Sequence, residues 1–239
     1  MALATRPSLS PAEALHATPP KLSAVEPRAA DLETMRAPRL RYDVVSRLLF
    51  ALIALVYGRA GNLRKFRALE PLARVPYHAW EQATYRAAGR LSHRANLAST
   101  VHRCILQSRA QQDNEQWHLF VLDEVIKARG ERLRRFGDRV LPRLLAGAYH
   151  PFTWLVLLVS PAYSYRLNAV FEDHAEHEYM AFVAQHPHLD RVRFTSKLGD
   201  VFAHLDTVAG LLRQIGHDER VHKLESLHEA ARAARRPTP

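Results

Sequence analysis

Residues 113–120 read DNEQWHLF, and residues 217–222 read HDERVH. Each stretch places a histidine three residues after a glutamate, and on an α-helix that spacing brings both side chains to one face. A carboxylate and an imidazole held in this way can ligate one metal ion together. Helical bundles with two metal ions combine two such pairs with one lone glutamate from each of two further helices. The pairs here are Glu115/His118 and Glu219/His222.

Two other pairs with the same spacing do not fit such a centre. Glu13/His16 lies among prolines, where no helical period holds it. Glu225/His228 follows Glu219/His222 by six residues. At about 3.6 residues per turn this is a rotation of about 240°, so both pairs cannot face the same centre.

Two lone glutamates complete the set. Glu70 stands in residues 66–77, which read FRALEPLARVPY, and Glu172 stands in residues 170–179, which read VFEDHAEHEY. Successive glutamates of the set are 45, 57 and 47 residues apart. Each interval accommodates one bundle helix and its connection, so we expect one ligating glutamate on each of four helices.

The composition indicates a globular, all-α protein. The 239 residues are 47% hydrophobic, and 34 Lys and Arg against 24 Asp and Glu give a net charge of +10. Good helix formers dominate, and the Asn-Gly and Asp-Gly turns of hairpins are missing. A single cysteine excludes a disulfide framework and a cysteine-built zinc site. We expect a disordered, proline-rich tail over 1–40, one domain over 41–229 and a frayed tail over 230–239.

Two apolar runs are unusual for a chain of this kind. Residues 48–57 read LLFALIALVY without a break, and a second run covers residues 144–159. Both are too short to span a bilayer, and runs of this size are typical of buried core helices or of interfacial segments. We expect helices over 43–58 and 139–160 that embed the protein in one leaflet, where neighbouring arginines suit anionic lipid headgroups.

The four boxes that carry these glutamates resemble those of the alternative oxidases, in the same order. Residues 69–77 are similar to the family's Leu-Glu-Thr motif, above all in the plastid terminal oxidase branch, where the motif continues into Ala-Arg-Val-Pro-Tyr. Residues 114–119, 160–179 and 218–222 resemble the other three boxes. The chain departs from the family at Pro71, which replaces the threonine. Leu32-Glu33-Thr34 spells the first motif literally, but it lies in the tail and lacks the continuation.

The resemblance implies a ferritin-like, antiparallel four-helix bundle with additional interfacial helices and a di-iron centre of two iron ions. The ligands that it implies are Glu70, Glu115, His118, Glu172, Glu219 and His222, with the histidines either on the iron or just outside it. Around these ligands it implies Asn114 and Asp218 as supporting residues and Tyr179 as a catalytic tyrosine. The quinol would contact Lys65, Leu69 and Ala175, and Lys65 stands where the family has arginine.

The function that the resemblance implies is a cyanide-insensitive quinol oxidase that reduces O2 to water. It would be monotopic and homodimeric at the cytoplasmic face of a bacterial inner membrane, or at an organelle's inner membrane, and would not bind nucleic acid. A di-iron hydroxylase of a quinone precursor remains open, because it would use the same carboxylates. A basic helical protein without enzymatic activity would leave the four ordered boxes unexplained.

Overall fold

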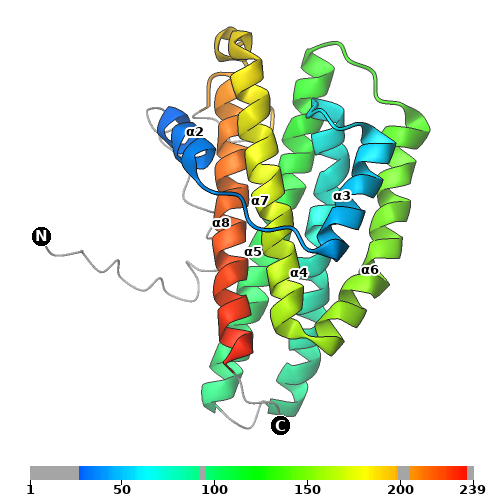
Figure 1. Ribbon diagram of the computed structural model, residues 1–239, viewed down its shortest axis with the longest axis vertical. Helices are drawn as coiled ribbons and strands as arrows, with labels where there is room; N and C mark the ends of the chain where they lie inside the picture. Colours follow the sequence, from blue (N-terminus) through cyan, green and yellow to red (C-terminus); the bar gives the residue numbers. More distant parts are fainter. Residues whose placement is uncertain (1–26, 92–94, 199–204, 236–239) are drawn as a thin grey trace, which may run out of the picture.

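The computed structural model describes residues 27–91, 95–198 and 205–235, and helices make up most of this part of the chain (Figure 1). The β-structure among the described residues is limited to one isolated bridge between Arg193 and Thr207. The expectation of an all-α protein is therefore confirmed.

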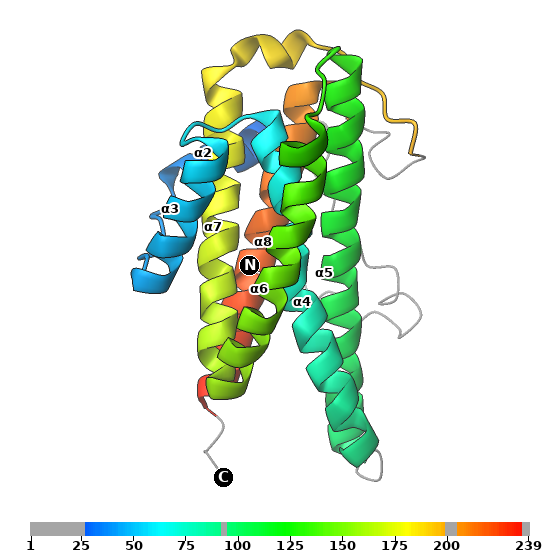
Figure 2. The ribbon, with the colours of Figure 1, turned by 90° about the vertical axis from the view of Figure 1, so that its right-hand side faces the viewer.

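Four long helices lie side by side along the molecule (Figures 1 and 2). They are α4 (Leu63–Leu91), α5 (Ala95–Ala128), α7 (Pro161–Gln185) and α8 (Val208–Ala234). Helix α4 packs against α5, α7 packs against α8, and further contacts join α4 to α7 and α5 to α8. The main hydrophobic core lies between these helices and includes the fully buried residues Leu122, Leu211 and Ile215.

Hydrogen-bonding side chains set the first residues of two of these helices. Ser160 precedes α7 and accepts a hydrogen bond from the backbone N–H of Tyr163, and Pro161 occupies the first helical position. Thr207 precedes α8 and accepts from the N–H of Gly210 at 3.0 Å. Such caps satisfy N–H groups that the helix leaves free, and they fix where each helix begins.

Helices α3 (Val44–Tyr57) and α6 (Leu141–Val159) lie along one side of the four long helices (Figure 2). Helix α6 follows a short π-helical turn, η1 (Arg135–Val140), and packs against α4 and α7, while α3 packs against α7. The two helices occupy the segments expected at 43–58 and 139–160. Among the helices that the structure describes, none has both the length and the apolar character that crossing a membrane requires.

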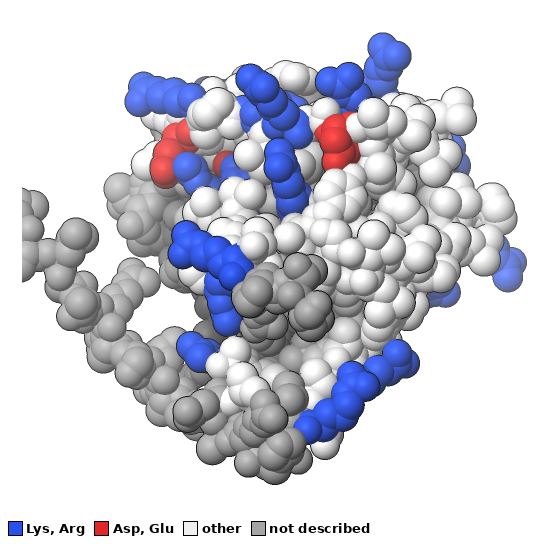
Figure 3. All heavy atoms as spheres, turned by 60° about the horizontal axis from the view of Figure 1, so that its bottom comes forward, with Lys and Arg blue, Asp and Glu red and all other residues white. Residues whose placement is uncertain are grey.

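The outer faces of α3 and α6 expose large apolar side chains. Leu48 and Leu55 on α3 are 67% and 83% exposed, and Leu158 and Val159 on α6 are 73% and 77% exposed. Figure 3 shows a broad, mostly uncharged area on the side where Figure 1 places these two helices. Lysines and arginines outnumber acidic residues over the rest of that view.

The two ends of the chain differ from expectation. Residues 27–36 are not a disordered tail but form helix α2 (Pro27–Arg36), which packs against α7 and α8 and buries Ala30 and Thr34. These tertiary contacts stabilise a helix that is too short to be stable alone. Helix α8 continues to Ala234, so residues 230–234 are helical rather than frayed. Residues 1–26 and 236–239, the rest of the two expected tails, lie outside the described residues.

Candidate metal centre

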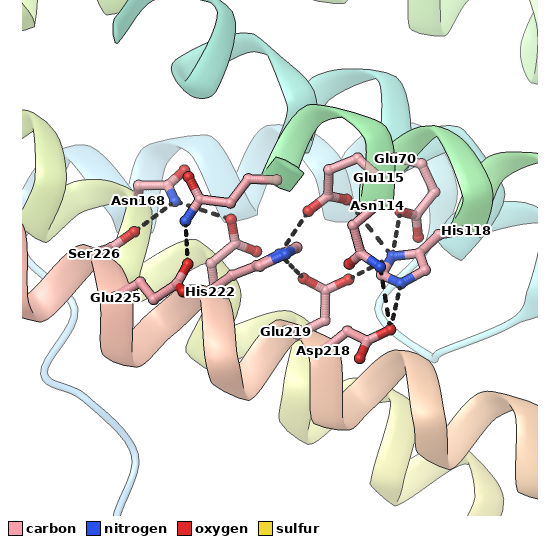
Figure 4. Close-up of polar contacts among 12 residues, drawn as sticks. Glu70, Asn114, Glu115, His118, Asn168, Asp218, Glu219, His222, Glu225 and Ser226 are labelled. Carbon is pink, nitrogen blue, oxygen red and sulfur yellow. Dashed lines mark hydrogen bonds and ion pairs between the residues drawn. The ribbon is translucent and has the colours of Figure 1, made fainter. Parts of the chain in front are cut away.

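Each of the four long helices points one glutamate into the space between them. Glu70 comes from α4, Glu115 from α5, Glu172 from α7 and Glu219 from α8, and all are at most 4% exposed. His118 on α5 and His222 on α8 are equally buried. The fold brings together all six ligands that the sequence suggested, and Figure 4 shows several of them converging.

These side chains form two overlapping groups. In one, ligand atoms of Glu70, Glu115, His118 and Glu219 all lie within 4.8 Å of one another. In the other, the same holds for Glu115, Glu172, Glu219 and His222. Glu115 and Glu219 therefore belong to both groups. We call the first group subsite A and the second group subsite B.

Several buried atoms of the centre make no hydrogen bond to any described residue. They include Oε2 of Glu70, both carboxylate oxygens of Glu115, Oε2 of Glu219 and Nδ1 of both histidines. The contacts of these atoms are ion pairs within the cluster, such as that of Nδ1 of His222 with Oε1 of Glu115 at 2.9 Å. A coordinated cation would reduce the cost of burying so many polar atoms that lack hydrogen bonds. The arrangement of unsatisfied oxygen and imidazole nitrogen atoms therefore fits a metal site.

The two histidines have different surroundings. Nδ1 of His118 lies 3.4 Å from Glu70 and 3.3 Å from Glu219, and its Nε2 lies 3.1 Å from Oδ2 of Asp218. Nδ1 of His222 lies 2.9 Å from Oε1 of Glu115. Nε2 of His222 makes no hydrogen bond within the described part of the chain.

Asp218 thus stands behind His118 in the position of a supporting carboxylate. Its Oδ1 accepts a 2.7 Å hydrogen bond from Gln214, and Asn114 donates to Oδ2, the oxygen that faces His118, at 3.3 Å. Carboxylates behind metal-bound imidazoles fix the ring orientation and raise its basicity. The two residues that the sequence suggested as supporting residues, Asn114 and Asp218, lie next to each other on this side of subsite A (Figure 4).

Burial and mutual repulsion shift the pKa values of the carboxylates in different directions. Burial raises the pKa of Glu70 to about 8, and burial together with the charges of Glu219 and Glu115 raises the pKa of Glu172 well above its usual range. Burial acts on Glu115 too, but the imidazoles of His118 and His222 outweigh it and lower its pKa to about 2. The positive charge of two imidazoles cannot balance the negative charge of four buried carboxylates, so a bound cation would stabilise the cluster.

A buried tyrosine hydroxyl contacts each of the two unshared glutamates. Tyr179 on α7 donates to Oε1 of Glu70 at 2.5 Å, and Tyr77 on α4 donates to Oε1 of Glu172 at 2.6 Å. Each tyrosine follows the unshared glutamate of its own helix by seven residues, yet bonds to the glutamate of the other helix. The sequence suggested Tyr179 but missed Tyr77, which the repeated seven-residue offset could have revealed.

A polar group of residues extends from Glu172 on the side of Tyr77. The amide of Asn168 donates to Glu172 at 2.9 Å and lies 3.1 Å from Oγ of Ser226 (Figure 4). Nearby, Gln111 donates to Glu225 at 2.7 Å. Glu225, which was not among the ligands suggested by the sequence, therefore takes part in a separate polar contact.

An apolar cavity of about 260 Å³ adjoins the centre. Its walls come mainly from α3, α4, α6 and α7, and Glu70, Glu172, Glu219 and Tyr179 are among the residues that line it. The three residues that the sequence suggested for quinol binding, Lys65, Leu69 and Ala175, all line this cavity. Nζ of Lys65 pairs with Glu178, another lining residue, at 3.1 Å.

The remaining candidates lie away from the centre. Glu33 of the tail motif Leu32-Glu33-Thr34 is exposed on α2, where it pairs with Arg220 at 2.8 Å. Glu13 and His16 lie outside the described residues. The chain matches neither a protein-family model nor a curated protein.

Proposed function

We propose that this protein is a quinol oxidase that reduces O2 to water at a di-iron centre. In this proposal α4, α5, α7 and α8 act as an antiparallel four-helix bundle that holds the two ions. One observation carries the proposal: two ligand groups share Glu115 and Glu219 and adjoin an apolar cavity.

The composition of the two subsites supports iron. Each offers one imidazole nitrogen together with several carboxylate oxygens, a donor set that suits iron in helical bundles. The shared glutamates would bridge the ions, while Glu70 and Glu172 would each bind one ion. Four carboxylates balance the charge of two divalent cations, which makes their burial tolerable.

The tyrosines would orient the unshared glutamates. The hydrogen bond from Tyr179 occupies Oε1 of Glu70, and Oε2 of the same carboxylate makes no hydrogen bond and is left for the ion. Tyr77 occupies Oε1 of Glu172 in the same way. Tyr179 also lines the cavity, so it would contact both the centre and a substrate there.

The cavity supports an apolar, two-electron donor. A quinol has an apolar body and two hydroxyl groups, and Leu69 and Ala175 would contact the body while the Lys65–Glu178 pair offers polar groups. Two quinols and one O2 give two quinones and two waters, so electrons and protons balance. The bound iron would supply the electron transfer to O2, and the chain would supply ligands, orientation and a site shielded from solvent.

The outer faces of α3 and α6 support attachment to one leaflet of a membrane. Their exposed leucines would enter the apolar layer, and exposed arginines such as Arg47 and Arg139 would meet the headgroups. Because α3 and α6 also wall the cavity, a quinol dissolved in the bilayer would reach the centre from the membrane side. On the basis of the resemblance, we propose a location at the cytoplasmic face of a bacterial inner membrane, or at an organelle's inner membrane, and a homodimer that does not bind nucleic acid.

Oxygen uptake by the purified, iron-loaded protein tests the activity. A short-chain quinol should drive uptake in the presence of millimolar cyanide, with two quinols oxidised for each O2 and no oxygen incorporated into the organic product. A hydroxylated product would point to the alternative, a di-iron hydroxylase of a quinone precursor. Complete inhibition by cyanide would contradict the proposed mechanism.

A further inference from the structure

A second buried charged cluster lies on α7 and α8, beside the residues that ligate subsite B. Nζ of Lys223 contacts carboxylate oxygens of Asp173, at 3.1 Å, and of Glu176. Both acidic side chains are fully buried, and Lys223 is 7% exposed. One ammonium group therefore links two carboxylates of α7 to α8.

The segment that begins with α2 completes this cluster. The hydroxyl of Thr34 donates to Oε1 of Glu176 at 2.6 Å, and the backbone N–H of Leu40 donates to Oδ2 of Asp173 at 3.0 Å. Together with Lys223, these contacts supply a partner to every carboxylate oxygen of the cluster. We call Thr34, Leu40, Asp173, Glu176 and Lys223 the N-terminal clasp.

Two members of the clasp are direct sequence neighbours of ligands of subsite B. Asp173 follows Glu172, and Lys223 follows His222. Subsite B therefore takes Glu172 from α7 and both Glu219 and His222 from α8, whereas subsite A takes only Glu219 from that pair of helices. A change in the α7–α8 spacing would alter subsite B more than subsite A.

We infer that the N-terminal clasp positions the ligands of subsite B, and that Thr34 is a positioning residue for the second metal ion. This inference rests on the proposed two-metal function. Buried charges are tolerated only when each is paired and hydrogen-bonded. Loss of the Thr34 hydroxyl removes the hydrogen bond to Oε1 of Glu176 and leaves that oxygen with Arg220 at 4.0 Å, which loosens the link from α7 to α8. Changes beyond the direct ligands of a metal typically reduce its affinity by about 10- to 100-fold.

Titration of the full-length, metal-free protein with Mn²⁺, followed by electron paramagnetic resonance, tests the inference. In the parent, two equivalents should give the spectrum of a coupled Mn²⁺ pair. Thr34→Val keeps the side-chain shape but removes the hydroxyl, and we expect its second ion to bind about tenfold more weakly. The signal of isolated Mn²⁺ should then appear at the same loading, and Thr34→Ser should restore the pair.

Glu33→Gln is the matched control, because it changes the neighbouring residue of α2 and removes a charge that is 68% exposed and pairs with Arg220, while the bond from Thr34 to Glu176 stays in place. Exposed pairs contribute little to stability, so this variant should behave like the parent. A parental spectrum for Thr34→Val, an equal loss of both ions, or the same defect in Glu33→Gln would overturn the inference.

Hydrogen exchange of the metal-free protein separates this inference from the proposed function. Thr34→Val should speed amide exchange over residues 172–180 and 219–226 relative to Glu33→Gln, whether or not metal binds. Unchanged exchange there would overturn the clasp. A parent that binds no pair of ions would contradict the di-metal function, and the exchange result would still decide whether the clasp holds the two helices.

Discussion

Glu115 and Glu219 are the two residues that both subsites require, so their replacement should have the largest effect on metal content. We predict that Glu115→Ala abolishes binding of both irons, whereas Glu70→Ala, which removes a ligand of subsite A alone, retains one. Iron analysis of the purified variants against Glu33→Ala measures this difference. Equal iron content in Glu115→Ala and the parent would contradict the assignment.

Tyr179 and Tyr77 donate equivalent hydrogen bonds, but only Tyr179 lines the cavity. We predict that Tyr179→Phe and Tyr77→Phe each lower quinol-driven oxygen uptake by at least about tenfold with iron content retained, because each removes the tyrosine's hydrogen bond to one unshared glutamate. Steady-state rates with a short-chain quinol give the comparison. Parental activity in Tyr179→Phe would remove that residue from the catalytic role.

The sequence indicated the candidate pairs Glu115/His118 and Glu219/His222 because Glu-x-x-His spacing is a property of a single helix. It could not reveal that Tyr179 bonds to Glu70, since the two residues are 109 positions apart and meet only after α4 and α7 pack. The contact of Thr34 with Glu176 could not be predicted for the same reason, because the two residues are 142 positions apart.

At the scale of single helices, we predict that the protein attaches to membranes through α3 and α6. We expect the double variant Leu55→Asp/Leu158→Asp to lose binding to anionic lipid vesicles while it keeps its iron, because charges replace apolar contacts with the bilayer. Leu224→Asp is the matched control, since Leu224 is a 55% exposed apolar residue on α8. Sedimentation with vesicles measures the bound fraction.

The parent should remain on the vesicles through a high-salt wash and leave them only in detergent, because apolar area supplies most of the attachment. Release of the parent by salt alone would show a purely electrostatic association. Equal loss of binding in the control variant would show that the α3–α6 face has no special role.

The sequence predicted α3 and α6 well because each contains a long apolar run, and such a run marks a segment strongly. Helix α2 was missed because it is only ten residues long and lies close to several prolines. Its contacts with α7 and α8 stabilise it, and contacts of this kind are not visible in a local pattern.

At the scale of the whole molecule, the buried cluster predicts an unusual dependence of stability on pH. Burial raises the pKa of Glu70 to about 8, and neighbouring carboxylates overcome burial and raise the pKa of His118 and His222. Between about pH 5 and about pH 8 the folded, metal-free chain therefore binds more protons at these groups than the unfolded chain. The free energy of unfolding should fall as the pH rises through this range.

Thermal unfolding of the metal-free protein across that range tests the prediction. The midpoint should fall with rising pH by about 3 °C for each kcal/mol lost, and Glu70→Gln should reduce the slope because it removes one of the titrating groups. Added metal should stabilise the protein more at the higher pH, since the ligands must lose protons to bind it. A midpoint that stays constant in the metal-free parent would contradict this account of the cluster.

The central claim is that the shared glutamates hold two ions side by side. Anomalous diffraction at the iron absorption edge, from crystals of the iron-loaded protein, tests that claim most directly. We predict two anomalous peaks about 3.5–4 Å apart, one beside Glu70 and His118 and the other beside Glu172 and His222, with Glu115 and Glu219 between them. A single peak, or none among these six side chains, would contradict the account.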